Sequence, residues 1–141
     1  MKPFTHKTRI GNIFDVLASP VEDDGQGFTV RRGSNRVQDT ILSVLSGDLS
    51  LEQIPKLAAS LRELLTSSVQ VILLDLSHVN TFCPNAASVL VNFVSFVEGG
   101  GKRLVLFRPS ESVQSTLSSL HLKHLFEIQQ SEDELLLTLP D

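Results

Sequence analysis

One cysteine and two closely spaced histidines are the side chains of this 141-residue sequence with the clearest potential for chemistry. Cys83 precedes a predicted helix start, which lowers the pKa of a thiol, but no basic residue accompanies it in the sequence. We therefore interpret Cys83 as a small buried cap. His121 and His124 are one helical turn apart, yet no cysteine or carboxylate pattern supplies the remaining ligands of a zinc site. We interpret them as a helix-end pair and expect neither a metal nor a cofactor.

Two motifs that would indicate an enzyme are incomplete or missing from the sequence. The segment 99–102 resembles a phosphate-binding loop only superficially, because its Gly-Lys pair is followed by a predicted strand instead of Ser or Thr and a helix. No G-x-S-x-G element supplies a nucleophilic serine. We therefore expect that the protein is not an enzyme.

Asp75 and Ser77 are polar residues at the end of a predicted buried strand. An aspartate in this position could hold an ion, but it more often accepts hydrogen bonds from the following turn, here from Ser77 or a backbone N–H group. We expect the turn and keep both residues as ligand or structural candidates. Arg31, Arg32 and Arg36 could pair with an acidic partner or with nucleotide phosphates, although a solvated hairpin tip explains them as well.

The composition and net charge limit the classes of partner that the protein can bind. The chain is 41% hydrophobic and 20% charged, as is usual for one globular domain, and its net charge is −4. A negative net charge argues against direct binding to nucleic acid or to anionic lipid. No segment approaches the ~20 apolar residues of a membrane span, and the first ten residues lack the apolar region of a secretory signal. We expect a cytoplasmic protein with protein partners.

Local patterns indicate the elements that position these residues. Residues 1–27 have weak periodicity and are interpreted as an N-terminal extension, and residues 28–141 as the domain. Segments 28–32 and 37–45 are extended in character and predict a hairpin that Gly47 ends. Ser50 and Gln53 then suggest a capping box for a helix with leucines at helical spacing, although Pro55 argues for a start a few residues later.

The second half of the sequence alternates short apolar strands with helices. Predicted strands cover 71–76, 104–107 and 126–129, and predicted helices run over 84–97, from 109–110 onward and over 132–139. This alternation predicts an α/β fold: a mixed, mostly parallel central sheet of about four to five strands with helices packed on it. Binding surfaces gather at the carboxyl ends of such strands, which directs attention to residues 75–88.

Several segments resemble the STAS domain family, and in particular its anti-sigma factor antagonists. Residues 72–91, ILLDLSHVNTFCPNAASVLV, resemble the family's apolar strand, Asp-Leu-Ser, turn and apolar helix. Gly47 to Leu49 resembles its Gly-x-Leu, residues 103–110 resemble its next strand and turn, and residues 120–128 resemble its closing element. By element order the resemblance covers about residues 28–139.

The resemblance implies a docking protein without catalytic activity. Its expected partner is an anti-sigma factor or a related kinase-like regulator, in bacterial transcription regulation. The phosphorylated antagonists read Asp-Ser-Ser/Thr-Gly-Leu at the turn, where this sequence has Cys83, Pro84, Asn85, Ala86 and Ala87. Neither Pro84 nor Asn85 carries a hydroxyl group, so the resemblance implies docking that does not depend on phosphorylation there.

The segment 79–97 contains no Asp, Glu, Lys or Arg. On the predicted helix, small uncharged residues recur at helical spacing, and depletion of charge is typical of the core of a protein interface. We therefore predict a partner-binding surface made of Thr81, Cys83, Pro84, Asn85, Ser88 and Asn92. The alternative is that the N-terminal extension covers this helix.

Two other functions remain open from the sequence. A small-ligand carrier could bind a nucleotide or a lipid head group at the same strand ends with Arg31, Arg32 or Asp75, because a fold does not determine a function. A phosphorylation switch could also use Thr81, Ser77 or Ser88. The sequence leaves a homodimer open as well.

Overall fold

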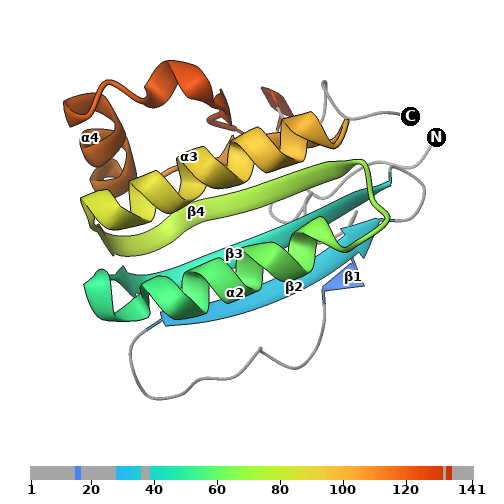
Figure 1. The fold of residues 1–141 in the computed structure, drawn as a ribbon, viewed down its shortest axis with the longest axis horizontal. Helices are drawn as coiled ribbons and strands as arrows, with labels where there is room; N and C mark the ends of the chain where they lie inside the picture. Colours follow the sequence, from blue (N-terminus) through green and yellow to red (C-terminus); the bar gives the residue numbers. More distant parts are fainter. Residues whose placement is uncertain (1–14, 17–27, 36–38, 132, 135–141) are drawn as a thin grey trace.

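The computed structural model describes residues 15–16, 28–35, 39–131 and 133–134. Six strands form one sheet in the order β1-β2-β3-β4-β5-β6, which is also their order along the chain. The β1–β2 and β2–β3 pairs are antiparallel and the remaining three pairs are parallel. The elements shown in Figure 1 are β1 (Asp15–Val16), β2 (Phe28–Asn35), β3 (Thr40–Leu49), η2 (Leu51–Gln53), α2 (Ile54–Leu65), β4 (Val71–Phe82), α3 (Pro84–Gly99), β5 (Arg103–Phe107), α4 (Glu111–Ser119), η3 (Lys123–Leu125) and β6 (Glu127–Gln129).

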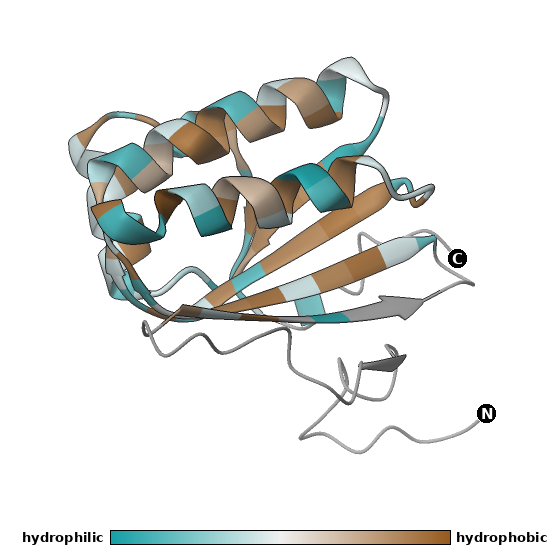
Figure 2. Ribbon diagram, turned by 60° about the horizontal axis from the view of Figure 1, so that its bottom comes forward, coloured by the Kyte–Doolittle hydropathy of each residue, from teal (hydrophilic) through white to brown (hydrophobic). Residues whose placement is uncertain are grey.

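The predicted mixed, mostly parallel sheet with packed helices is confirmed. Helices α2 and α3 lie side by side on one face of the sheet (Figure 2). The main hydrophobic core lies between these helices and the strands, with Leu57 and Leu64 from α2, Leu90 from α3, and Ile72 and Leu74 from β4 almost fully buried. Complete burial of one such side chain contributes about 1.5–3 kcal/mol, so this layer supplies much of the stability.

A second, smaller apolar cluster lies on the other face of the sheet. It consists of strand residues only: Leu42, Val71, Leu73, Val105 and Phe107, with Val44 packed against them. Alternation along each strand sends neighbouring side chains to opposite faces, which is why β4 contributes Leu73 to this cluster and Ile72 to the main core. A central strand that is apolar on both faces accounts for the continuous apolar run from Val71 to Leu74.

Gly47 does not end its strand as predicted. Strand β3 continues to Leu49, and Gly47 adopts a φ of 103° where the register against β4 shifts. Glycine accepts this left-handed backbone conformation without steric cost, so the chain forms a bulge and then continues the strand. The hairpin itself is confirmed, with Phe28 opposite Gly47 and Asn35 opposite Thr40.

Helix α2 begins later than Ser50, as Pro55 suggested. A short 3₁₀ turn, Leu51–Gln53, precedes it, and Pro55 falls in the first turn of the α-helix, where a missing N–H group costs little. The capping box was wrong: the Ser50 hydroxyl makes no capping hydrogen bond, and the Gln53 N–H group donates to the Ser50 carbonyl at 3.0 Å instead.

Strand β4 is longer than predicted. The expected end at Leu76 was wrong, because parallel pairing with β3 resumes at Ser46 opposite His78 and continues to Leu49 opposite Phe82. Pairing with β5 does stop earlier, at Asp75 opposite Phe107. The last seven residues of β4 therefore have a neighbouring strand on one side only.

Two predictions concern the ends of the chain. The N-terminal extension over 1–27 lies outside the described residues, except that Asp15 and Val16 pair with β2. Of the helix predicted over 132–139, only Asp133 and Glu134 are described, and both are helical. The Glu134 N–H group donates to the Ser131 hydroxyl at 3.1 Å, a typical helix-start bond. No helix in the described part of the chain is long and apolar enough to cross a membrane.

Candidate functional site

The turn from β4 into α3 is the centre of the predicted site. It is a single residue, Cys83, whose extended backbone (φ −78°, ψ 160°) precedes Pro84 at the start of the helix. The Cys83 carbonyl accepts hydrogen bonds from the N–H groups of Ala86 and Ala87 at 3.0 and 3.3 Å. The Cys83 N–H group donates to the Leu49 carbonyl at the end of β3, at 3.1 Å. Backbone bonds from two elements therefore fix the position of the turn.

The side chains predicted to meet a partner face solvent. Thr81, Pro84, Asn85, Ser88 and Asn92 are all exposed, and together they run from the end of β4 along the outer side of α3. The alternative, in which the N-terminal extension covers this helix, concerns residues 1–27, which apart from Asp15 and Val16 lie outside the described residues. The structure thus brings the predicted residues together on one surface, which we call the α3 stripe and define as Thr81, Cys83, Pro84, Asn85, Ser88 and Asn92.

Cys83 is the member of the α3 stripe that faces the interior. Its side chain is half-buried and packs against the main core. The helix-start position makes no side-chain capping hydrogen bond. The thiol therefore acts mainly as a small packing group below the turn.

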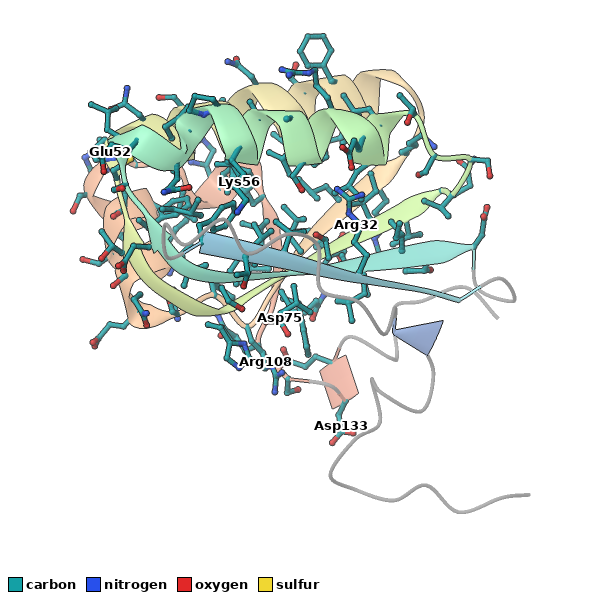
Figure 3. The ribbon with its side chains drawn as sticks, turned by 90° about the horizontal axis from the view of Figure 1, so that it is seen from below. Arg32, Glu52, Lys56, Asp75, Arg108 and Asp133 are labelled. Carbon is teal, nitrogen blue, oxygen red and sulfur yellow. The ribbon has the colours of Figure 1, made fainter. Side chains whose placement is uncertain are left out.

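Asp75 lies inside β4 and not at its end, which corrects its predicted position. Its carboxylate is buried, and Oδ1 accepts hydrogen bonds from the Ser77 N–H group at 2.9 Å and from the Ser77 hydroxyl at 2.7 Å. The predicted hydrogen bonding with Ser77 is confirmed. Oδ2 lies 3.5 Å from a terminal nitrogen of Arg108, which follows β5. Figure 3 shows Asp75 and Arg108 on the side of the sheet away from α2 and α3.

Arg108 was not identified from the sequence. Its backbone has a φ of 48°, its N–H group donates to the Gln129 carbonyl at 2.8 Å, and its guanidinium lies 4.7 Å from the centre of the Phe107 ring. These contacts join β4, β5 and β6 and depend on strand pairing, so no local sequence pattern predicts them. One signal was available: a buried aspartate usually pairs with a cation, and Arg108 directly follows the neighbouring strand.

Three hydroxyl groups from the α4 region hold the end of β4. The hydroxyls of Ser110, Ser112 and Thr116 donate to the carbonyls of residues 79, 80 and 82 at 2.7, 2.6 and 2.8 Å. These carbonyls lie beyond the point where β5 stops pairing, so α4 takes over part of the role of the missing strand. Ser110 also caps α4 by accepting from the Val113 N–H group, which confirms the helix start predicted there.

A polar hollow of about 500 Å³ adjoins the α3 stripe between the end of β4 and α4. Thr81 belongs to both the hollow and the stripe, and the other lining residues are Asn80, Phe82, Glu111, Ser112, Ser115 and Thr116. No sequence pattern indicates this hollow, because it arises from the packing of α4 against β4. Its lining adds hydrogen-bonding groups beside an otherwise small and uncharged surface.

Of the three hairpin arginines, only Arg32 has a described side chain, and it is not part of a solvated tip. Arg32 is largely buried and donates to Oε1 of Glu63 at 2.7 Å and to the carbonyl and hydroxyl oxygens of Ser60, each at 3.0 Å. It reaches from β2 to α2, as Figure 3 shows. The prediction was wrong for Arg32 because its position on β2 points toward the helix layer. The Arg31 side chain and the whole of Arg36 lie outside the described residues.

The two histidines do not form a pair on one helix end. Helix α4 ends at Ser119, His121 has a φ of 58°, and His124 lies in η3. The intervening residues leave helical geometry, so sequence spacing does not translate into a shared face. No cluster of three or more metal-ligating side chains occurs among the described residues.

An ion pair that shifts the pKa of a carboxyl group lies away from the α3 stripe, at the edge of the sheet. Nε of Arg103 donates to Oε1 of Glu127 at 2.8 Å, and the second guanidinium nitrogen contacts Oε2. The hydrogen bond from Arg103 lowers the pKa of Glu127, with a further contribution from Gln129 and opposition from partial burial. This pair links β5 to β6 and has a structural role.

Residues 34–135 of the chain match the STAS domain family. Comparison with curated proteins gave no match. Among solved structures, the chain is similar to an anti-sigma factor antagonist from Mycobacterium paratuberculosis, with 13% identity, coverage of 89% of this chain and 95% of that chain, and a TM-score of 0.64. It is also similar to the anti-sigma factor antagonist SpoIIAA in its unphosphorylated form, with 15% identity, coverage of 77% and 92%, and a TM-score of 0.60.

The phosphorylated form of the Bacillus cell fate determinant SpoIIAA gives 14% identity, coverage of 77% and 96%, and a TM-score of 0.56. These structural likenesses confirm the α/β architecture that the sequence predicts. The family match spans more than half of the chain. The chain therefore belongs to the STAS domain family.

Proposed function

We propose that this STAS domain is a regulatory docking protein whose partner binds the α3 stripe. The observation that carries the proposal is the exposure of a helix that has no charge before Glu98: five of the six stripe residues face solvent, and the sequence from 79 to 97 has no charged side chain. An exposed helix normally keeps charges on its outer face, and their loss is typical of an interface core. The partner class is an anti-sigma factor or a related kinase-like regulator in the bacterial cytoplasm.

The rigidity of the turn supports docking over catalysis. Backbone hydrogen bonds position Cys83, and α4 hydroxyl groups hold the preceding end of β4. A surface that is ordered before binding loses less conformational entropy on association. The α3 stripe holds no paired nucleophile and base, so its chemistry suits recognition by shape and hydrogen bonding, and we propose that the protein has no enzymatic activity.

We further propose that docking does not require phosphorylation at the turn. Both the phosphorylated and the unphosphorylated form of SpoIIAA have been solved. In this chain the two turn positions hold Pro84 and Asn85, which cannot accept a phosphoryl group on oxygen. The exposed hydroxyls of Thr81 and Ser88 are the alternative acceptors within the stripe. The intact mass of the protein isolated from its own cells tests this proposal. Added phosphate would show that another hydroxyl group is phosphorylated.

Small-ligand binding at the strand ends is the weaker alternative. Two of its three suggested contacts, Arg32 and Asp75, already bond within the chain, to Glu63 and Ser60 and to Ser77 and Arg108. A thermal shift against a panel of nucleotides and lipid head groups tests it. A true ligand at ~100 times its dissociation constant would stabilise the fold by about 2.7 kcal/mol, whereas we expect no shift.

The docking proposal is tested by the double variant Asn85→Arg, Ser88→Arg. Two guanidinium groups on a surface without charges should weaken partner binding at least about tenfold, because each must be desolvated without an acceptor. The measurement is quantitative mass spectrometry of proteins recovered with the tagged chain from its host. The matched control is Ser68→Arg, which adds a charge at an exposed position before the amino end of β4.

A specific partner retained by Ser68→Arg and lost by the double variant would place docking on the α3 stripe. Full retention of every partner by the double variant would overturn the proposal. Both variants change exposed residues only, so equal thermal melting temperatures should accompany either result. The partner sought here is a different protein.

A further inference from the structure

The polar hollow of about 500 Å³ lies where α4 packs beside the end of β4 (Figure 1). The apolar side chains of α4, Val113 and Leu117, are buried in the main core. The polar side chains that line the hollow follow at helical spacing and therefore share the neighbouring face of the helix: Glu111, Ser112, Ser115 and Thr116. The fold thus presents four polar side chains of one helix to a single recess.

The hydroxyl groups of Ser112 and Thr116 have already used their hydrogens. They donate to the carbonyl groups of residues 80 and 82 in β4, at 2.6 and 2.8 Å. Because a hydroxyl group has one hydrogen and two lone pairs, these two oxygens can only accept further hydrogen bonds. Three other side chains of the lining also carry an acceptor oxygen: Asn80, Thr81 and Ser115. The lining therefore offers more acceptor groups than donor groups.

Glu111 gives the hollow a negative charge. It is the one charged side chain among the described lining residues, it is exposed, and no described residue pairs with its carboxylate. The positive end of α4 offsets only part of this charge, because a helix dipole is equivalent to about half an elementary charge at each end. A second exposed carboxylate is near, since Asp48 lies opposite Thr81 in the register of β3 and β4. The described residues thus place negative charge, and no Lys, Arg or His, around the hollow.

A lining of this kind selects a ligand that donates hydrogen bonds and carries a positive charge. Phosphate and carboxylate groups carry a negative charge and only accept, so they would meet Glu111 and a row of unmatched acceptors. A guanidinium group has five N–H donors in a planar fork and no acceptor, whereas an ammonium group is a compact point charge. Acceptors on both β4 and α4 surround the hollow, so the fork can reach more of them than an ammonium group can. Arginine is therefore the side chain that matches the hollow best.

We propose that the hollow binds an arginine side chain of the protein that docks on the α3 stripe. That the arginine comes from this partner rests on the proposed function, whereas the preference for arginine follows from the lining itself. The guanidinium group pairs with the Glu111 carboxylate and donates to the hydroxyl oxygens of Ser112 and Thr116. Thr81 belongs to both the hollow and the stripe, so one partner surface can contact the two together.

The arginine contact adds an electrostatic requirement that the α3 stripe lacks. The stripe has no charged side chain, so it distinguishes partners by shape and hydrogen bonding only. A complementary charge pair at its edge fixes the register of the partner and disfavours partners with an acidic group in that place. The apolar groove between α2 and α3 does not offer the same contact, because the charged side chain among its described lining residues is Arg62, which would repel a second arginine.

An NMR titration of the full chain with the peptide acetyl-Gly-Arg-Gly-amide tests the proposal without any partner. At low ionic strength we expect saturable shifts of the amide signals of Ser112, Ser115 and Thr116, with a dissociation constant below ~20 mM. The same peptide with citrulline, which has the shape of arginine without its charge, should bind at least about fivefold more weakly. Glu111→Gln should weaken binding of the arginine peptide to a similar extent. The matched control is Glu98→Gln, at an exposed position near the carboxyl end of α3, which should bind the arginine peptide as wild type does.

Three results would each overturn the proposal: a dissociation constant of the arginine peptide above ~20 mM, equal binding of the arginine and citrulline peptides, or wild-type binding by Glu111→Gln. A lysine peptide that binds as tightly as the arginine peptide would overturn the choice of a guanidinium group. Since Glu111 is exposed, Glu111→Gln should keep the wild-type amide spectrum outside α4. The titration uses no partner, so its failure is distinct from that of the proposed function, which the double variant Asn85→Arg, Ser88→Arg tests.

Discussion

Asp75 illustrates how a buried charge is accommodated in this fold. Its carboxylate is 4% exposed and would be costly to bury alone. Two donors from Ser77 and the nearby guanidinium of Arg108 provide the compensation. The Asp-Leu-Ser segment is thus a local structural unit of β4, and its hydrogen bonds are satisfied without any ligand. The contact between Asp75 and Ser77 therefore stabilises the fold, and substitution of either residue should change the free energy of unfolding.

Ser77→Ala should lower the free energy of unfolding by about 1–3 kcal/mol, because it removes a hydroxyl donor to a buried carboxylate and leaves part of that charge unsolvated. Urea denaturation at neutral pH measures the change. Ser88→Ala is the control, since Ser88 is exposed and surface substitutions without such bonds usually change stability by less than about 0.5 kcal/mol. Equal effects of the two substitutions would contradict the structural role of the Ser77 hydroxyl.

At the scale of elements, β4 and α4 depend on each other. The last part of β4 pairs with β3 alone, and the α4 region supplies three hydroxyl donors to its carbonyls on the other side. This arrangement allows β4 to extend beyond β5 and to deliver the chain to the start of α3. The position of the α3 stripe therefore depends on side chains that lie 31 to 34 residues after the carbonyl groups they bind.

Thr116→Val should destabilise the end of β4 with little change of shape, because valine keeps the volume but cannot donate to the Phe82 carbonyl. The expected loss is about 1–3 kcal/mol, the cost of an unsatisfied buried acceptor. Hydrogen exchange should accelerate at the amide of Cys83, whose N–H group donates to Leu49 in the same region. Thr66→Val is the control, since its hydroxyl bonds only within its own helix end. Unchanged protection at Cys83 would show that α4 does not hold the strand.

At the scale of the molecule, the features that the sequence predicts are those encoded locally. Apolar runs and helical stripes are read over a few residues, so the order of strands and helices and the helix start at Pro84 could be predicted. The length of β4 could not, because it depends on pairing with β3 across a bulge at Gly47 and on donors from α4. The sequence shows that residues 79–97 are uncharged, whereas the apolar groove between α2 and α3 arises only when the two helices pack together.

The edge of the sheet formed by β6 should make the free energy of unfolding depend on pH in the acid range. Strand β6 has three residues and pairs with β5, and the Arg103–Glu127 contact joins the two strands. The hydrogen bond from Arg103 lowers the pKa of Glu127 in the folded state. A carboxyl group with a lowered folded pKa stabilises the fold above its unfolded pKa, near 4.3, and this contribution is lost as the pH falls through the lowered value.

Glu127→Gln tests this contribution by removing the charge at constant size. Because both side chains are about one-third exposed, solvent screening limits the expected loss to less than about 1 kcal/mol at neutral pH. Urea unfolding from pH 7 to pH 2 should show wild type more stable than the variant at neutral pH, with the difference disappearing in acid. Glu98→Gln, at an exposed position near the end of α3, should follow wild type throughout. A difference between wild type and Glu127→Gln that stayed constant down to pH 2 would show that packing, and not the ionised pair, joins β6 to the sheet.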